Sequence, residues 1–118
     1  MRCNKYHAKK TVVDGIAFDS KKEAMRWRYL KNLEDLGIIK ELERQVPFGL
    51  LPAQKLKEPR PTKGKRQMTE RAVKYIADFC YIQDGKMIVE DTKGLKTPEY
   101  ILKRKMVLYF YGIEIREV

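Results

Sequence analysis

The sequence is poor in several residue types that mark particular classes of protein. Among its 118 residues it has two cysteines, Cys3 and Cys80, and a single histidine, His7. Two cysteines are too few for a disulfide framework, and their spacing does not fit a zinc site. We therefore expect Cys80, which lies in a strand-like pattern, to be a reduced thiol in the core. His7 lies in an irregular basic segment and is expected to be a surface residue.

Long apolar segments are also missing. No run of about 18 apolar residues occurs, so a membrane-spanning helix is not expected. The first residues, MRCNKYHAKK, lack the apolar core of a secretory signal peptide. No basic amphipathic helix of the kind that lies on a membrane surface stands out. The sequence thus predicts a cytoplasmic protein with no membrane partner.

Acidic residues are few relative to basic ones. The chain has 16 Asp and Glu against 26 Lys and Arg, which gives a formal net charge of +10 at pH 7. Such an excess indicates a polyanionic partner, most often a nucleic acid, although it says nothing about catalysis. With 43% apolar residues, a chain of this length has enough material for one packed domain and not for two.

Turn and cap signals mark the elements of the first third of the chain. An Asp-Gly pair between the short apolar runs of residues 11–18 predicts a hairpin. Ser20 as N-cap, Gly37 as a stop and apolar residues at helical spacing between them predict a helix over 20–36.

The rest of the chain carries a second helix and several strands. Thr97 as N-cap, Pro98 at the first helical position and Gly112 as a stop predict a helix whose apolar content suggests that it is well buried. The other expected elements, in chain order, are a strand over 38–48 that ends at Pro47, an exposed and mobile basic loop over 52–71, and strands at about 72–83, 86–93 and 113–118.

The order of these elements predicts the fold class. A hairpin, a helix, three strands, a helix and a last strand indicate a small α/β domain with a mixed central sheet flanked by two helices. We expect a single domain over residues 1–118, with a basic N-terminal arm and hairpin at 1–18 and the flexible basic loop at 52–71.

The segment YIADFCYIQDGKMIVEDTKG, residues 75–94, contains the most informative pattern. If its Asp-Gly pair forms a type I′ turn, the residue numbers of paired positions add to 169. Asp78 then lies directly opposite Asp91 on one face, with Cβ atoms about 5 Å apart. Lys93, two residues past Asp91, points to the same face.

Two opposed carboxylates among apolar neighbours repel each other. Either one of them is protonated or a cation lies between them. Carboxylate oxygens suit Mg²⁺, with Mn²⁺ as a substitute, and together with the ammonium of Lys93 they are the groups needed to hydrolyse a phosphodiester. The alternative is a purely structural pair of Asp and Lys, with the second aspartate at a strand end.

The chain resembles the PD-(D/E)xK nuclease superfamily in this Asp, twelve residues, Asp-x-Lys pattern and in its element order. It is similar to archaeal-type Holliday junction resolvases and to a family of small phage and prophage proteins. The segments that carry the second similarity are NKYHAKKTVVDGIAFDSKKEA, KYIADFCY and IVEDTKG, and it extends over nearly the whole chain outside residues 52–70.

The resemblance implies a role for each site residue. Asp78 and Asp91 would bind the metal, Lys93 would be the catalytic lysine, Glu23 would complete the metal cluster, and the backbone carbonyl of Thr92 would face the ion. Gln45 is a possible supporting group around these ligands.

Three points stay open at this stage. Ala77 replaces the proline of the superfamily motif. Glu90, next to Asp91, would become the ligand if the hairpin were shifted by one residue. Ser20 and Glu23 also form a capping box, in which the glutamate is needed only to close the helix start.

The overall hypothesis is a magnesium-dependent endodeoxyribonuclease, structure-selective and similar to Holliday junction resolvases. It would act in phage DNA recombination or replication in the cytoplasm of a bacterial host, as a homodimer on branched DNA. The alternative is a non-catalytic DNA-binding accessory protein for recombination on the same fold. A sequence-specific nuclease or a transposase-like end-cleaving subunit ranks below both. The residues expected to contact DNA are Lys5, Lys9, Lys10, Lys65, Arg66 and Lys96.

Overall fold

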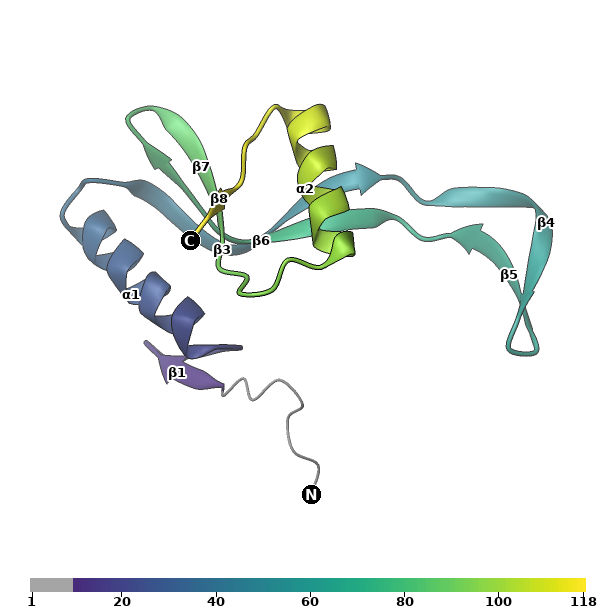
Figure 1. Ribbon diagram of the computed structural model, residues 1–118, viewed down its shortest axis with the longest axis horizontal. Coiled ribbons are helices and arrows are strands. Elements are labelled where there is room, and N and C mark those ends of the chain that lie inside the picture. The colour runs from purple at the N-terminus through teal and green to yellow at the C-terminus, as the bar shows by residue number, and fades with distance from the viewer. Residues whose placement is uncertain (1–9) are drawn as a thin grey trace, which may run out of the picture. The chain divides into compact units, whose positions relative to one another are not determined.

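A computed structural model describes residues 10–118 of the chain (Figure 1). Its elements are, in order, β1 (Thr11–Val13), β2 (Ile16–Phe18), α1 (Lys21–Asp35), β3 (Lys40–Leu51), β4 (Gln54–Thr62), β5 (Lys65–Glu70), β6 (Val73–Gln83), β7 (Lys86–Asp91), α2 (Pro98–Tyr111) and β8 (Arg116–Glu117). The fold is a mixture of α and β structure, as predicted.

The strands form three sheets in this part of the chain. A four-stranded sheet has the order β3-β6-β7-β8, and the pairs β1-β2 and β4-β5 form two-stranded sheets. β6 and β7 pair antiparallel, whereas β7 and β8 pair parallel, so the central sheet is mixed as expected.

The chain divides into two compact units. The first comprises Met1–Val46, Ala77–Leu95 and Ile115–Val118, and the second comprises Pro47–Ile76 and Lys96–Glu114. Strands β3 and β6 each begin in one unit and end in the other.

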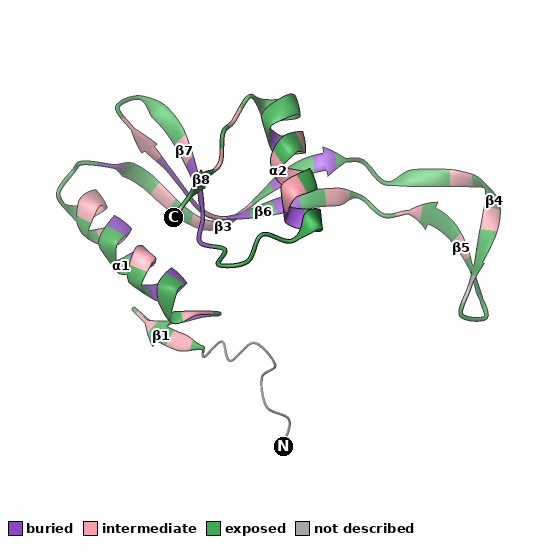
Figure 2. Ribbon diagram, in the orientation of Figure 1, coloured by how far each residue is buried: buried purple, intermediate pink, exposed green. Residues whose placement is uncertain are grey.

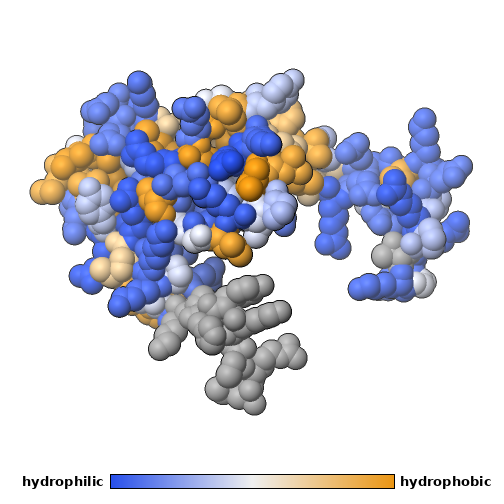
Figure 3. Space-filling model, in the orientation of Figure 1, coloured by the Kyte–Doolittle hydropathy of each residue, from blue (hydrophilic) through white to orange (hydrophobic). Residues whose placement is uncertain are grey.

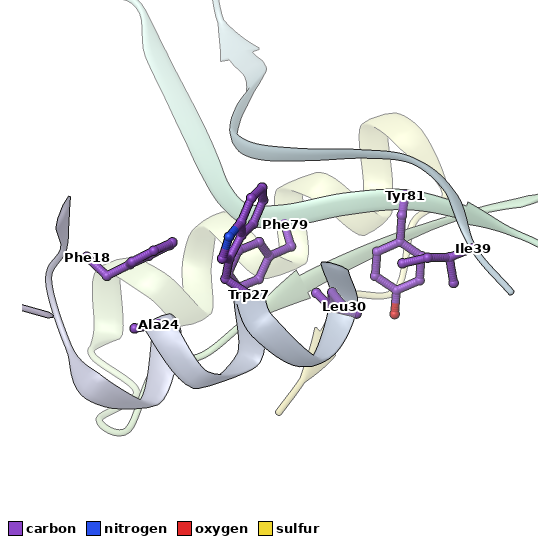
Figure 4. Packing of buried hydrophobic residues seen from close by; sticks show 7 residues of the cluster. All are labelled: Phe18, Ala24, Trp27, Leu30, Ile39, Phe79 and Tyr81. Atoms are coloured by element: carbon purple, nitrogen blue, oxygen red, sulfur yellow. The ribbon is translucent and has the colours of Figure 1, made fainter. Parts of the chain in front are cut away.

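The core of the first unit lies between α1 and the strands (Figure 4). Trp27 is at its centre, with its ring 6.1 Å from that of Phe18 and 6.2 Å from that of Phe79. Its indole Nε1 donates to Asp14 Oδ2 over 3.0 Å, which ties the helix to the turn of the first hairpin. The whole cluster consists of Phe18, Ala24, Trp27, Leu30, Ile39, Phe79 and Tyr81.

Helix α1 begins and ends within one residue of the predicted limits. Ser20 is its N-cap, and the Ser20 hydroxyl accepts from the Glu23 amide over 3.1 Å. At its end Gly37 takes a φ of +77°, which glycine adopts without strain.

An aromatic cluster holds the second unit together. The ring of Phe48 lies 6.4 Å from that of Tyr75 and 5.3 Å from that of Tyr111, and Tyr75 lies 6.3 Å from Tyr100. The Tyr111 hydroxyl donates to the Gly49 carbonyl over 2.7 Å. The ends of α2 in this unit follow the prediction, with Thr97 as N-cap, Pro98 in the first turn and Gly112 at the left-handed C-cap.

The expectation that α2 is well buried is wrong. Only Tyr100 and Val107 of this helix are buried, and Tyr109 is 83% exposed. Apolar residues surround the helix on all sides, and a helix that packs on one side buries a single stripe.

The expected basic loop at 52–71 is instead a β-hairpin. β4 and β5 pair antiparallel around a turn at Lys63 and Gly64, whose φ values of 48° and 76° are those of a type I′ turn. The prolines of this segment, Pro59 and Pro61, had argued against a strand. They are tolerated because every strand of a two-stranded sheet is an edge strand.

Three strand limits also differ from the sequence expectation. β3 continues past Pro47 to Leu51, because it is the outer strand of its sheet and an outer strand tolerates a residue without an N–H. β7 ends at Asp91, two residues early, and the last strand is reduced to Arg116–Glu117.

Candidate active site

The hairpin of β6 and β7 has the predicted register. Asp84 and Gly85 take φ values of 52° and 75°, as in a type I′ turn. The paired positions run from Gln83 opposite Lys86 to Phe79 opposite Glu90. The next position in the same register sets Asp78 against Asp91, so the geometric argument from the sequence is confirmed up to the last pair that precedes the site.

Asp78 is held by the residue that follows β7. The amide and the hydroxyl of Thr92 both donate to Asp78 Oδ2, each over 2.8 Å. Thr92 is buried, with 8% of its surface exposed. Sequence reasoning had assigned Thr92 only a carbonyl toward a metal and missed this role, because a threonine after a strand carries no signal for a cross-strand bond.

Asp91 lies at the buried end of β7. It is 1% exposed, and its Oδ1 accepts from the Lys93 amide over 2.9 Å. The Asp91 carbonyl accepts from the Val118 amide over 3.0 Å, so the backbone here is fixed from the parallel strand as well. Lys93 itself is exposed and lies beyond the end of the strand.

The Glu23 carboxylate accepts from the backbone at Asp19, beside the helix start, and also from a side chain of β3. It is 5% exposed, and its Oε1 accepts from Gln45 Nε2 over 3.2 Å. Gln45 has a φ of 55°, a left-handed conformation that a non-glycine residue adopts at a cost of about 1–3 kcal/mol. The Gln45 named from the sequence as a supporting group is thus in contact with the candidate acid.

The acidic groups of the site act on one another. Burial raises the pKa of Glu23, and the negative charges of Asp78 and Asp19 raise it further. Burial also raises the pKa of Asp78 and the charge of Asp91 adds to this, whereas the bonds from Thr92 and the charge of Lys93 oppose it. Of the four residues predicted for catalysis, Asp78 thus interacts electrostatically with each of the other three, Glu23, Asp91 and Lys93, and all four belong to the first unit.

Glu90 has a separate role. It is fully buried, and Arg26 binds both of its carboxylate oxygens, through Nε to Oε1 at 2.8 Å and through Nη2 to Oε2 at 2.7 Å. The Tyr81 hydroxyl donates to the same Oε2. Neighbouring residues of a strand point to opposite faces, so Glu90 lies on the face opposite Asp91 and the shifted register is not adopted.

The donor set suits a hard divalent cation. Within residues 10–118, no group of three or more His, Cys, Asp and Glu side chains is already close enough together to hold a metal ion. Yet mutual repulsion contributes to the raised pKa values of Glu23 and Asp78, and a cation between the carboxylates would remove that repulsion. Carboxylate oxygens are the ligands that Mg²⁺ prefers. The residues present fit such an ion in their ligand chemistry.

Comparison with known proteins places this chain in a family. Residues 3–117 match the model described as "Protein of unknown function (DUF1064)". The chain belongs to the DUF1064 family. No curated protein and no solved structure matches it. The match to DUF1064 includes every residue of the candidate site.

The predicted DNA-contacting residues are dispersed. Lys5 and Lys9, like His7 and Cys3, lie outside the residues that the structure describes. Lys10 and Lys96 are exposed, and Lys65 and Arg66 are exposed at the start of β5. Neither α1 nor α2 is long and apolar enough to cross a membrane, and these are the helices of the part of the chain that is described.

Proposed function

We propose that this DUF1064 chain is a Mg²⁺-dependent endodeoxyribonuclease of the PD-(D/E)xK type, with Mn²⁺ as a substitute ion. The observation that carries the proposal is the register of β6 and β7, which runs regularly to Phe79 opposite Glu90, together with the electrostatic interaction of Asp78 and Asp91 at the next position. The resemblance noted in the sequence points further, to a restriction-endonuclease-like core and to a structure-selective enzyme that cuts branched DNA as a homodimer during phage recombination or replication in the bacterial cytoplasm.

Three carboxylates would hold the ion. Glu23, Asp78 and Asp91 supply oxygen ligands, and Thr92 keeps Oδ2 of Asp78 occupied, so Oδ1 is the oxygen that would bind. When bound, Mg²⁺ lowers the pKa of a water molecule and offsets the negative charge that develops on a phosphate. The bond from Gln45 fixes the Glu23 carboxylate in its orientation.

Lys93 would act on the substrate directly. Its ammonium is a compact charge with three donors on a flexible stem, and its charge reaches Asp78. In the free protein it offsets part of the acidic charge of the site. With DNA present it would donate to the scissile phosphate or orient the attacking water.

A nuclease panel tests this function. Supercoiled DNA, linear duplex and a four-way junction would be incubated with Mg²⁺ and the wild-type chain, Asp78→Asn, Asp91→Asn or Lys93→Ala. The matched control is Asp35→Asn, which removes an exposed carboxylate from the same unit. We expect each site variant to lose about 10²–10³-fold in cleavage rate and the control to retain it. Strong cleavage in EDTA, or undiminished cleavage by Asp91→Asn, would overturn the proposal.

Calorimetry with Mn²⁺ separates the enzyme from a DNA-binding accessory protein. The nuclease requires Mn²⁺ binding that is lost in Asp78→Asn. DNA binding without any metal binding dependent on Asp78 would show that the fold serves a non-catalytic role.

A further inference from the structure

The hairpin of β4 and β5 is a ribbon with exposed faces. Its two strands pair only with each other among the described residues. Between residues 54 and 70, no side chain whose burial is described is buried (Figure 2). An isolated two-stranded hairpin is marginally stable in water, so a ribbon without a core of its own is expected to gain order from a partner.

The positive charge of this ribbon indicates a polyanionic partner. Residues 54–71 contain seven Lys and Arg against two Glu, which is half of the net charge of the whole chain in 18 residues. Figure 3 shows the ribbon, at the right of the view, as predominantly hydrophilic. The basic residues are Lys55, Lys57, Arg60, Lys63, Lys65, Arg66 and Arg71.

Among the described residues, only one of these cations, Arg60, has an acidic partner. Arg60 pairs with Glu70 over 3.4 Å, in a bridge whose side chains are 66% and 43% exposed. No other ion pair joins a residue of the ribbon to the part of the chain that the structure describes. Uncompensated, solvated cations at this density bind polyanions.

The tip of the ribbon has the highest density of charge. The turn contains Lys63, and the adjacent pairs set Thr62 against Lys65 and Pro61 against Arg66. Three cations thus lie within four residues, on an element only two strands wide. The side chains from Lys63 onward also line a shallow hollow of about 700 Å³ along β5.

The dimensions favour double-stranded DNA among the polyanions. Two paired strands are about 5 Å apart, and the major groove of B-form DNA, about 12 Å wide, admits a two-stranded ribbon. The major groove of an RNA duplex is deep and narrow and does not admit one. A single strand offers no groove.

We propose that the β4–β5 ribbon is an arm that enters the major groove of duplex DNA and binds its phosphates through Lys63, Lys65 and Arg66. The nucleic acid that the chain binds must then include a double-stranded segment. This inference rests on the proposed function only in that DNA is taken as the polyanion, and its test measures binding without cleavage.

Fluorescence anisotropy in EDTA provides the test. The probes are a labelled DNA duplex, an RNA duplex of the same sequence and a single DNA strand. The ribbon variant is Lys63→Gln/Lys65→Gln/Arg66→Gln. The control, Lys40→Gln/Lys86→Gln/Lys105→Gln, removes the same charge from exposed positions elsewhere. Circular dichroism confirms that both variants are folded.

We expect the ribbon variant to bind the DNA duplex at least about tenfold more weakly than wild type at moderate salt. The slope of log K against log salt should become shallower by about 2–3, as expected when three phosphate contacts are lost. The control should lose less than half as much. The RNA duplex and the single DNA strand should bind weakly, and their affinities for the ribbon variant and for the control variant should be equal.

Three results would overturn the inference. They are equal losses in the ribbon and control variants, retention of wild-type affinity and salt slope by the ribbon variant, and equally ribbon-dependent binding of RNA or single strands. If duplex binding depends on the ribbon but the chain cleaves no DNA, the proposed DNA-binding arm is supported and the proposed nuclease function is overturned. If the chain cleaves DNA with a metal ion but the ribbon variant binds DNA like wild type, the nuclease function is supported and the proposed arm is overturned.

Discussion

Arg26 of α1 donates hydrogen bonds to both carboxylate oxygens of Glu90 in β7, over 2.8 and 2.7 Å. Arg116 Nη1 donates to the Tyr81 hydroxyl over 3.2 Å, and this hydroxyl in turn bonds to Glu90. The helix that carries Glu23 and the strand that carries Asp91 are therefore joined by a buried polar network one residue away from the candidate active site.

Removal of Arg26 should destabilise the fold strongly. Arg26→Met leaves the fully buried Glu90 carboxylate without its only positively charged partner among the described residues, which is expected to lower the free energy of unfolding by about 3–5 kcal/mol. Urea denaturation at pH 7 measures this. As a control, Glu99→Gln breaks an exposed pair with Lys103 and should change stability by about 0.5 kcal/mol or less. An Arg26→Met chain as stable as the control would show that the network is not structural.

The hydroxyl of Thr92 should lower the pKa of Asp78. Thr92→Val keeps the amide bond to Asp78 Oδ2 and loses the hydroxyl bond, which favours the charged carboxylate. The pKa of Asp78 should rise further, so the acid side of the pH–rate profile for cleavage moves to higher pH and activity recovers at alkaline pH. Thr92→Ser retains a hydroxyl and should follow the wild type. Identical profiles for the Val and Ser variants would contradict this role.

Neutralising Glu23 should stabilise the metal-free protein at alkaline pH. Burial raises the pKa of Glu23 above its ordinary value of 4.5. The folded state thus binds a proton that the unfolded state releases, so the contribution of Glu23 to stability is most favourable below pH 4.5 and is lost as pH rises through the raised pKa. In EDTA, Glu23→Gln should unfold at higher urea than wild type at pH 8, and this difference should shrink to nothing as pH falls. A difference that does not vary with pH would rule out this account.

Cys80 should be unreactive in the folded chain. Burial, aided by the charge of Glu43, raises the pKa of its thiol to about 11. In a Cys3→Ser variant, alkylation of Cys80 at pH 8.5 should be at least about a hundredfold slower in buffer than in urea, because the thiolate is the reactive form. Mass spectrometry of timed samples measures both rates. Comparable rates would mean that the strand opens freely.

Much of the site could be predicted because its signals are local. A type I′ turn requires positive φ at both central residues, and Asp84 and Gly85 adopt it. Once these two residues are placed in the turn, the cross-strand pairs follow from their residue numbers. The predicted helix ends were similarly accurate. Ser20, Thr97 and Gly112 are capping residues, which bond to backbone groups only a few positions away in the sequence.

The features that were missed depend on partners distant in sequence. The bond of Arg26 to Glu90 spans 64 positions, and that of Thr92 to Asp78 joins two strands. Neither leaves a periodic pattern. The β4–β5 ribbon was missed for a different reason, because its prolines and lysines are the residues that normally argue against a strand.

The composition of the outermost strands bears on how the molecule behaves at high concentration. β3, at one side of the central sheet, contains Pro47 and two residues with positive φ, Glu41 and Gln45, and β8 at the other side has only two residues. Neither presents the long, regular row of N–H and C=O groups onto which a strand of another molecule could add. Addition of a strand from another molecule at the edges of the central sheet is therefore disfavoured.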